Sequence, residues 1–279
     1  MEQPETTTPV CYRHPDRITG LACSRCGRPI CVECSIDNSV GQLCPECAAP
    51  SGNHRVVRAR RVYGRPTFQT APVSFSLIAV SLAIYVLSML SAEFDVWSFR
   101  TFAQANFLVA AGDWWRIFTA ALLHANLMHI GFNMYALWLF GPRMEQQVGA
   151  PAFAALYLAS AGTGGLFSYL LGPTEQISIG ASGAIFGLFG AWIFVAWKMR
   201  HTPGGRSMFA QLGILLVLNL LISLAPGIDG LAHLGGFVAG VGIAALWSKF
   251  AVGRPNAVGV RTAIATAVVA VDLLAVLFL

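Results

Sequence analysis

The chain has 279 residues, of which 56% are hydrophobic and only 11% are charged. Soluble domains contain about 25% charged residues, so this composition argues against a soluble protein and favours a membrane protein. The net charge of +5 does not indicate a nucleic-acid partner, because the basic residues are scattered between apolar segments.

Three zones follow one another along the chain. Residues 1–50 are polar and contain all seven cysteines, residues 51–71 form a basic linker, and long apolar runs begin near residue 72. We therefore expect a small N-terminal domain over 1–50, a membrane core over 72–250 and a further spanning helix within 251–279.

The N-terminal zone carries its candidate metal ligands in pairs. Two intervening residues separate the members of each pair: Cys11 and His14, Cys23 and Cys26, Cys31 and Cys34, Cys44 and Cys47. Eight such ligands suffice for two tetrahedral zinc ions. Disulfides are the alternative, but an odd number of cysteines in a cytoplasmic segment opposes them. The spacing predicts two structural zinc ions, with no ion required for catalysis.

The apolar part of the chain predicts seven spanning helices. The runs lie near 73–91, 117–140, 152–171, 181–198, 208–225, 231–248 and 262–279. Each is close to the ~20 residues that cross a hydrocarbon core as a helix. If the N-terminus is cytoplasmic, all but two of the 18 Lys and Arg residues, Arg100 and Arg116, lie on the inner side. The positive-inside rule therefore predicts a multi-pass cell-membrane protein with a cytoplasmic N-terminus and an outer C-terminus.

Four of the polar residues inside the apolar runs call for explanation: His129, Asn133, Ser182 and His233. Such residues are costly in a bilayer and usually face a cavity or a partner. Ser182 lies in GASGAIFG (180–187), where glycine allows a sharp turn next to the hydroxyl. The alternative for this segment is helix packing, because Gly183 and Gly187 form a GxxxG pair.

Two strips of glycine suggest that Ser182 and His233 meet. Gly236 and Gly240 share a helical face with His233, and Gly183, Gly187 and Gly190 follow Ser182. Both helices run from outside to inside, so the two side chains lie at similar depth. A serine beside a histidine forms a nucleophile–base pair, although a single membrane histidine is more often a structural hydrogen-bonding residue.

His129 and Asn133 are four residues apart and share one helical face. Acyl transfer develops negative charge on a carbonyl oxygen, and a histidine N–H, an asparagine amide and the Ser182 backbone N–H can stabilise that charge. The alternative is that His129 and Asn133 only link helices.

Together these motifs resemble the rhomboid protease family. The motifs appear in the family's order over about residues 72–250: Trp115–Arg116; His124, His129 and Asn133; Gly180–Gly183; and His233, Gly236 and Gly240. The resemblance implies an all-α membrane protein with a six-helix core and one C-terminal helix (6+1), preceded here by the zinc-bound domain.

The resemblance also implies the role of each residue. Ser182 is the expected nucleophile and His233 the general base, in a dyad without an acidic third member, while His129 and Asn133 support the oxyanion. Supporting positions are Gly180, Gly183, Gly236 and Gly240, Phe186 packed on the histidine ring, and Trp115, Arg116 and His124 as structural residues. Asp229 precedes His233 by four residues and is expected to cap its helix.

The implied substrates are membrane-spanning proteins, cut near the outer face of the bilayer. The cysteine pairs resemble a B-box-type finger, in which the first and third pairs share one ion and the second and fourth share the other; sequential pairing is the alternative. We expect the finger to bind a cytoplasmic protein partner or to regulate the protease. Competing interpretations are a rhomboid-like pseudoprotease and a membrane-anchored zinc-finger adaptor without proteolysis.

Overall fold

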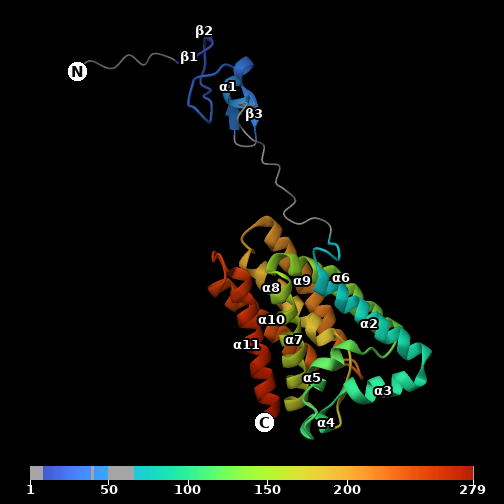
Figure 1. Ribbon diagram of the computed structural model, residues 1–279. Helices are drawn as coiled ribbons and strands as arrows, with labels where there is room; N and C mark the ends of the chain where they lie inside the picture. The colour runs from blue at the N-terminus through green and yellow to red at the C-terminus, as the bar shows by residue number, and fades with distance from the viewer. Residues whose placement is uncertain (1–8, 39–40, 50–65, 279) are drawn as a thin grey trace. The chain divides into compact units, whose positions relative to one another are not determined.

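The computed structural model describes residues 9–38, 41–49 and 66–278. The chain divides into two compact units, Met1–Val62 and Tyr63–Leu279 (Figure 1). The predicted linker (51–71) falls mostly outside the described residues, so its conformation stays a prediction.

The N-terminal unit consists of short elements around its cysteines. The strands β1 (Val10–Cys11) and β2 (His14–Ile18) form one antiparallel hairpin, and β3 (Ile36–Asn38) and β4 (Gly41–Leu43) form another. The short helices are η1 (Val32–Cys34) and α1 (Pro45–Ala48). Its buried core is made of five cysteines with Ile30 and Leu43. Because so few apolar side chains are buried, the core by itself contributes little folding free energy.

The second unit is a helical bundle. Its elements are α2 (Pro72–Leu90), α3 (Ala92–Phe102), β5 (Gln104–Ala105), α4 (Asn106–Ala110), α5 (Arg116–Thr119), η2 (Ala120–Leu122), α6 (Leu127–Val148), α7 (Ala150–Leu171), β6 (Ile177–Ser178), α8 (Ser182–Lys198), α9 (Pro203–Ile222), α10 (Gly230–Phe250) and α11 (Ala257–Phe278). Its largest buried cluster joins α6, α7, α8, α10 and α11 through side chains such as Leu137, Phe153 and Leu188.

Within the described residues, five helices are long and apolar enough to cross a membrane: α2, α7, α9, α10 and α11. The protein is therefore a multi-pass membrane protein. Helix α8 has only 17 residues, and α6 is less apolar because it carries His129, Asn133 and Arg143. The expected count of seven spanning helices therefore stays a prediction for α6 and α8.

The apolar run at 117–140 differs from the expected single helix. The chain first forms α5 and η2, and α6 begins only at Leu127, where the Asn126 side chain accepts a hydrogen bond from the His129 N–H at 2.9 Å. Helix α6 then continues to Val148, beyond the end of the apolar run near residue 140. Hydropathy does not detect this capping residue, which determines where α6 starts.

The short elements between α2 and α6 lie at the end of the bundle where the chain also ends (Figure 1). Buried Arg116 holds them together, since its guanidinium donates to the carbonyl oxygens of Arg100 and Ala103, both at 2.7 Å, and to the Asp113 carboxylate at 2.8 Å. The Trp115 indole N–H donates to the Thr101 carbonyl at 3.1 Å. These contacts hold the segment between α3 and α5 together, and the structural role expected of Trp115 and Arg116 stays a prediction.

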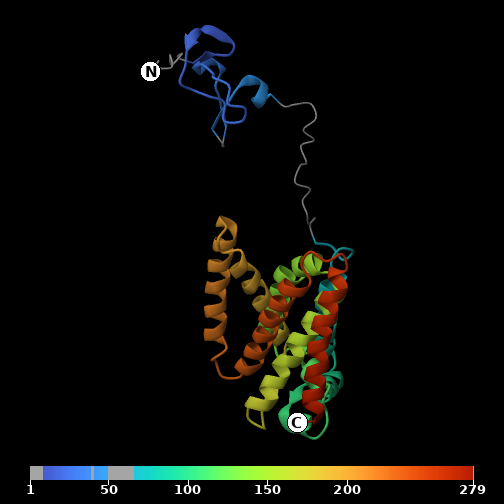
Figure 2. The same ribbon diagram turned by 90° about the vertical axis from the view of Figure 1, so that its left-hand side faces the viewer.

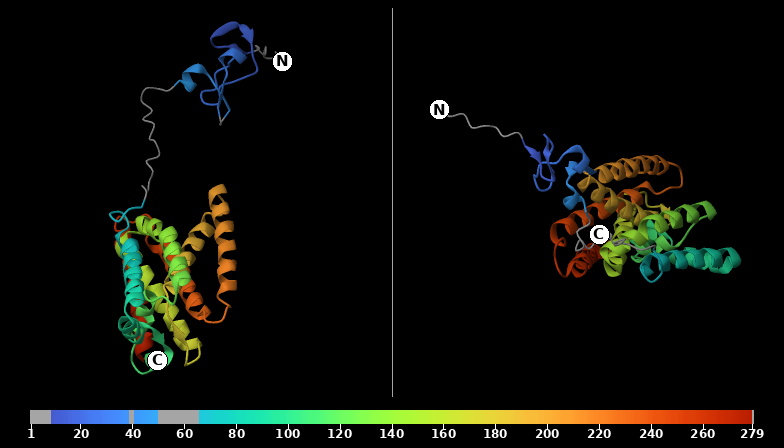
Figure 3. Two further views of the ribbon diagram at one scale, coloured as in Figure 1. Left: turned by 90° about the vertical axis from the view of Figure 1, so that its right-hand side faces the viewer. Right: turned by 90° about the horizontal axis from the view of Figure 1, so that it is seen from above.

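Helix α9 lies at one edge of the bundle (Figures 2 and 3). It packs chiefly on α8, and most of its apolar side chains are exposed, as expected for a helix that faces lipid.

Candidate active site

Ser182 and His233 form the centre of the candidate site. Ser182 is the first residue of α8, and its Oγ lies 2.8 Å from Nε2 of His233 in the first turn of α10. This is hydrogen-bond distance for a nucleophile and its base. The His233 side chain is buried.

The glycines of α8 and α10 allow this contact. A Cβ at Gly236 would overlap the Gly183 carbonyl oxygen, and a Cβ at Gly240 would overlap that of Gly187. The second contact lies four residues further along both helices than the first, so α8 and α10 run parallel with their backbones in contact. The facing glycine strips inferred from the sequence are therefore present, and they place the starts of the two helices side by side.

The segment before Ser182 is held from two sides. Strand β6 pairs with β5, and the Gly180 N–H donates to the Ala120 carbonyl at 2.9 Å. Gly180 has φ +125°, which residues with a side chain rarely adopt. This turn leads directly into α8 at Ser182.

His129 and Asn133 of α6 approach the same segment. A Cβ at Gly180 would lie 2.5 Å from His129 Nε2 and 3.7 Å from Asn133 Nδ2, so both groups reach the backbone two residues before Ser182. His124 lies before α6, with its ring edge-on to His129 at 5.1 Å between centroids. Neither ring nitrogen of His124 has a partner among the described residues.

Phe186 and Asp229 fix the surroundings of His233. The Phe186 ring stacks on the imidazole, with centroids 4.2 Å apart and planes at 12°. The Asp229 carboxylate accepts from the Ala232 N–H at 3.0 Å and so caps α10, as expected. Its other oxygen accepts from the hydroxyls of Ser168 and Ser178.

No sequence pattern indicates Ser223, which contacts the other side of His233. Its Oγ lies 2.6 Å from His233 Nδ1, and this buried serine is the C-cap of α9. A serine at the end of an apolar run is common and marks no site by itself.

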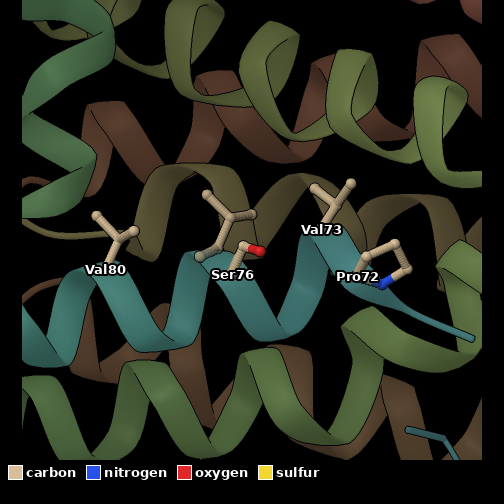
Figure 4. A pocket seen from close by; sticks show the side chains of 5 residues that line it. Pro72, Val73, Ser76 and Val80 are labelled. Atoms are coloured by element: carbon tan, nitrogen blue, oxygen red, sulfur yellow. The ribbon is translucent and has the colours of Figure 1, made fainter. Parts of the chain in front are cut away.

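A groove on α2 lies outside this site. Its lining residues all belong to α2: Pro72, Val73, Ser76, Leu77 and Val80 (Figure 4). The groove has a volume of about 280 Å³ and an almost entirely apolar surface, without a nucleophile–base pair. It is a feature of the helix surface that lipid can fill.

The N-terminal unit gathers its ligands into two clusters. One contains Cys11, His14, Cys31 and Cys34, and the other Cys23, Cys26, Cys44 and Cys47, with all ligand atoms of a cluster within 4.8 Å of one another. The first pair is thus grouped with the third and the second with the fourth, the cross-braced order. All seven cysteines are free thiols.

The ligand spacing fits a tetrahedral metal ion. His14 Nδ1 lies 3.8 Å from the sulfur of Cys11 and 3.4 Å from those of Cys31 and Cys34, and the sulfurs of Cys26 and Cys44 are 3.8 Å apart. Ligands of one zinc ion at bond lengths of about 2.0–2.3 Å are separated by roughly 3.4–3.8 Å.

The pKa values of two thiols in this unit are shifted in opposite directions. Burial opposes ionisation of Cys11, but the backbone N–H groups of Cys31 and Arg13 and the His14 side chain lower its pKa to about 6. Burial together with the neighbouring thiols of Cys31 and Cys11 raises the pKa of Cys34 to about 11. A divalent cation would relieve this crowding of negative charge and hold all the thiols as thiolates.

The protein thus has the fold of a multi-pass helical membrane protein with a serine–histidine pair. Comparison with known proteins agrees: a Rhomboid domain matches residues 111–250. The chain is 33% identical over 195 residues to the rhomboid protease GluP of Bacillus subtilis (strain 168), which covers 68% of this chain and 37% of GluP. It is 34% identical over 170 residues to "Putative rhomboid protease YdcA" of the same organism, covering 61% of this chain and 85% of YdcA.

A third relative is Rhomboid-type serine protease 2 of Emericella nidulans, 30% identical over 141 residues, which is 50% of this chain and 27% of the relative. The chain therefore belongs to the rhomboid family. The chain spans well under half the length of GluP and of the Emericella protein.

Proposed function

We propose that the protein is an intramembrane serine endopeptidase in which Ser182 is the nucleophile and His233 the general base. The observation that carries the proposal is the 2.8 Å contact between Ser182 Oγ and His233 Nε2. In the acylation step His233 takes the hydroxyl proton while Oγ bonds to the scissile carbonyl carbon, and the proton then passes to the leaving amine.

The developing oxyanion is stabilised by the Ser182 backbone N–H with His129 and Asn133. The Ala125 N–H points at His129 Nδ1 from 3.4 Å, which makes Nδ1 the acceptor and puts the ring proton on Nε2. Nε2 is also the atom beside Gly180, so His129 can donate a hydrogen bond toward the site.

The proposed substrates are membrane-spanning proteins that are cut near the outer face of the bilayer. This follows from the N-in orientation favoured by the Lys and Arg distribution, because Ser182 then lies at the outer end of α8. We also propose that α6 and α8 span with the other five helices. Helix α8 begins inside the bundle, so its 17 residues need not cross the whole hydrocarbon core.

The two ligand clusters hold one structural zinc ion each. Thiolate and imidazole donors in fourfold sets are typical of zinc, and a complete set leaves no open position for catalysis. The domain would then present a folded surface to a cytoplasmic protein or regulate cleavage.

The proposal is tested with purified full-length protein in lipid vesicles that contain a single-span substrate. Wild-type protein should release the cleaved product and react with a fluorophosphonate, while Ser182→Ala should do neither. Ser207→Ala, which removes an exposed hydroxyl, is the matched control and should behave as wild type. Cleavage that persists in Ser182→Ala would refute the assigned nucleophile.

A further inference from the structure

His233 uses both ring nitrogens in hydrogen bonds. Nε2 lies 2.8 Å from Ser182, and Nδ1 lies 2.6 Å from the Oγ of Ser223. Ser223 is 8% exposed and joins α9 to the loop before α10, so it approaches the imidazole from the side opposite the nucleophile.

The hydrogen bonds of Ser223 favour one position of the imidazole proton. The Ser223 hydroxyl has one proton, which it donates to the Asn219 carbonyl at 2.7 Å. With that proton engaged, the same oxygen accepts toward His233, which favours the tautomer with the ring proton on Nδ1. Nε2 is then unprotonated and accepts the hydrogen bond of Ser182, which is the tautomer that a general base needs.

The nearby carboxylate does not take this role. Asp229 is engaged by the Ala232 N–H, Ser168 and Ser178, and Ser223 is the partner of Nδ1 within the described part of the chain. A hydroxyl oxygen therefore occupies the place that an aspartate holds in a Ser–His–Asp triad.

We propose that Ser223 is a positioning residue, which holds His233 in the Nδ1–H tautomer and stabilises the imidazolium during catalysis; this rests on the proposed function. When Ser182 Oγ attacks the carbonyl carbon, its proton moves to Nε2 and the Nδ1–H remains bonded to Ser223. Nε2 then gives that proton to the amine as the C–N bond breaks. The Ser223 bond is strongest while the ring is charged, so it favours the transition state over the resting enzyme.

The kinetic test compares Ser223→Ala, Ser223→Thr and Asn219→Ala in full-length protein in lipid. Ser223→Ala should lower kcat and the rate of fluorophosphonate reaction about tenfold with KM unchanged, as expected when one hydrogen bond to a charged ring is lost. Ser223→Thr keeps the hydroxyl and should restore most of the rate. Asn219→Ala is the control, because it removes a similar hydrogen bond, from the Asn219 side-chain amide to the Leu215 carbonyl four residues earlier at 2.8 Å. This bond does not contact His233, so the variant should leave kcat unchanged.

A second readout tests the tautomer without a substrate. In protein labelled with ¹⁵N-histidine, the Nδ1 signal of His233 is assigned by its loss in His233→Ala. Its chemical shift should be that of a protonated nitrogen in wild type and that of a mixture of both tautomers in Ser223→Ala. If Ser223→Ala does not fold, Ser223→Cys serves in its place, because a thiol is a weak acceptor.

The inference is overturned if kcat and the Nδ1 signal of the hydroxyl-free variant match wild type, or if Asn219→Ala loses as much rate as Ser223→Ala. Failure of the proposed function looks different: wild type itself would neither cleave nor react with fluorophosphonate, while the Nδ1 signal would still report the tautomer.

Discussion

Gly180 combines a backbone and a steric requirement at one residue. Its φ of +125° disfavours a side chain, and a Cβ would meet His129 Nε2 at 2.5 Å. We expect Gly180→Ala to displace His129 and to lower kcat about 100-fold, the usual cost of losing one oxyanion donor. The cleavage assay in vesicles measures this loss.

Gly131→Ala is the matched control for Gly180→Ala. Gly131 lies on α6 beside His129, and a Cβ there meets nothing within 4 Å. This variant should keep its activity and gain about 0.4–1 kcal/mol in the free energy of unfolding. Equal activity of the two alanine variants would contradict a role for His129 at the oxyanion.

The stacking of Phe186 on His233 leads to a second prediction about single residues. Because it lies flat on His233 with centroids 4.2 Å apart, its removal should free the imidazole to rotate. Phe186→Ala should lower the unfolding free energy by about 3–5 kcal/mol and reduce kcat. Phe186→Tyr keeps the ring and should retain kcat within a few-fold. Loss of activity in Phe186→Tyr to the level of Phe186→Ala would show that ring stacking is not what matters.

The residues of the candidate site differ in how far the sequence could predict them. The proximity of Ser182 and His233 was predictable because the facing glycine strips relate their two helices, whereas Phe186 was expected only through the resemblance to the rhomboid family. Asp229 was predictable as a cap because capping is local. Ser223 was not, since its contact with His233 depends on how the loop after α9 folds back, and no periodic pattern records that path.

At the scale of elements, Glu145 explains how α6 continues through a charged segment. Its buried carboxylate accepts from the Val73 N–H at 2.9 Å and from the N–H and hydroxyl of Ser74 at 2.8 and 2.7 Å. These are free donors of the first turn of α2, where a negative charge is also favoured by the helix dipole. The charge is therefore paired with a helix end and fixes α2 against α6.

We expect Glu145→Ala to lower the unfolding free energy by about 1–3 kcal/mol, because buried donors of α2 lose their acceptor. Glu145→Gln keeps one acceptor oxygen and should lose less. Unfolding in mixed detergent micelles, followed by circular dichroism, measures the difference. Glu175→Ala is the control, since Glu175 is exposed, and its effect should stay within about 0.5 kcal/mol. A similar loss in both alanine variants would argue against this capping role.

The positions of the helices were predictable where a long apolar segment specifies them. The five strongly apolar helices lie close to their runs in the sequence, because long apolar segments need the backbone partners that a helix supplies. The extent of α6 was not, because hydropathy does not register the polar Asn126 cap at its start, and because the donors for the buried Glu145 carboxylate near its end come from α2.

At the scale of the whole molecule, the chain combines two units that are stabilised differently. The helical unit buries a large apolar cluster, whereas the N-terminal unit buries mainly cysteines of the two candidate metal clusters. The pairing of cysteines by two intervening residues predicted the ligand set, but only the fold decided that alternate pairs join, because spacing alone permits both orders.

This difference predicts that metal removal unfolds one unit and spares the other. Structural zinc contributes about 10–16 kcal/mol of binding free energy in small zinc domains, far more than the few buried apolar side chains of this unit. A strong zinc chelator should therefore unfold the N-terminal unit and leave the helical circular dichroism of the membrane unit nearly unchanged.

The cysteines make this measurement specific, because all seven lie in the N-terminal unit. A thiol reagent should react slowly with the zinc-loaded protein and rapidly with all seven thiols once the chelator is added. Cys34→Ser breaks one cluster and should expose the thiols of that cluster, Cys11 and Cys31, without chelator. Thiols that stay protected after zinc removal would mean that the unit folds on its apolar core, and loss of the helical signal would mean that the two units depend on each other for stability.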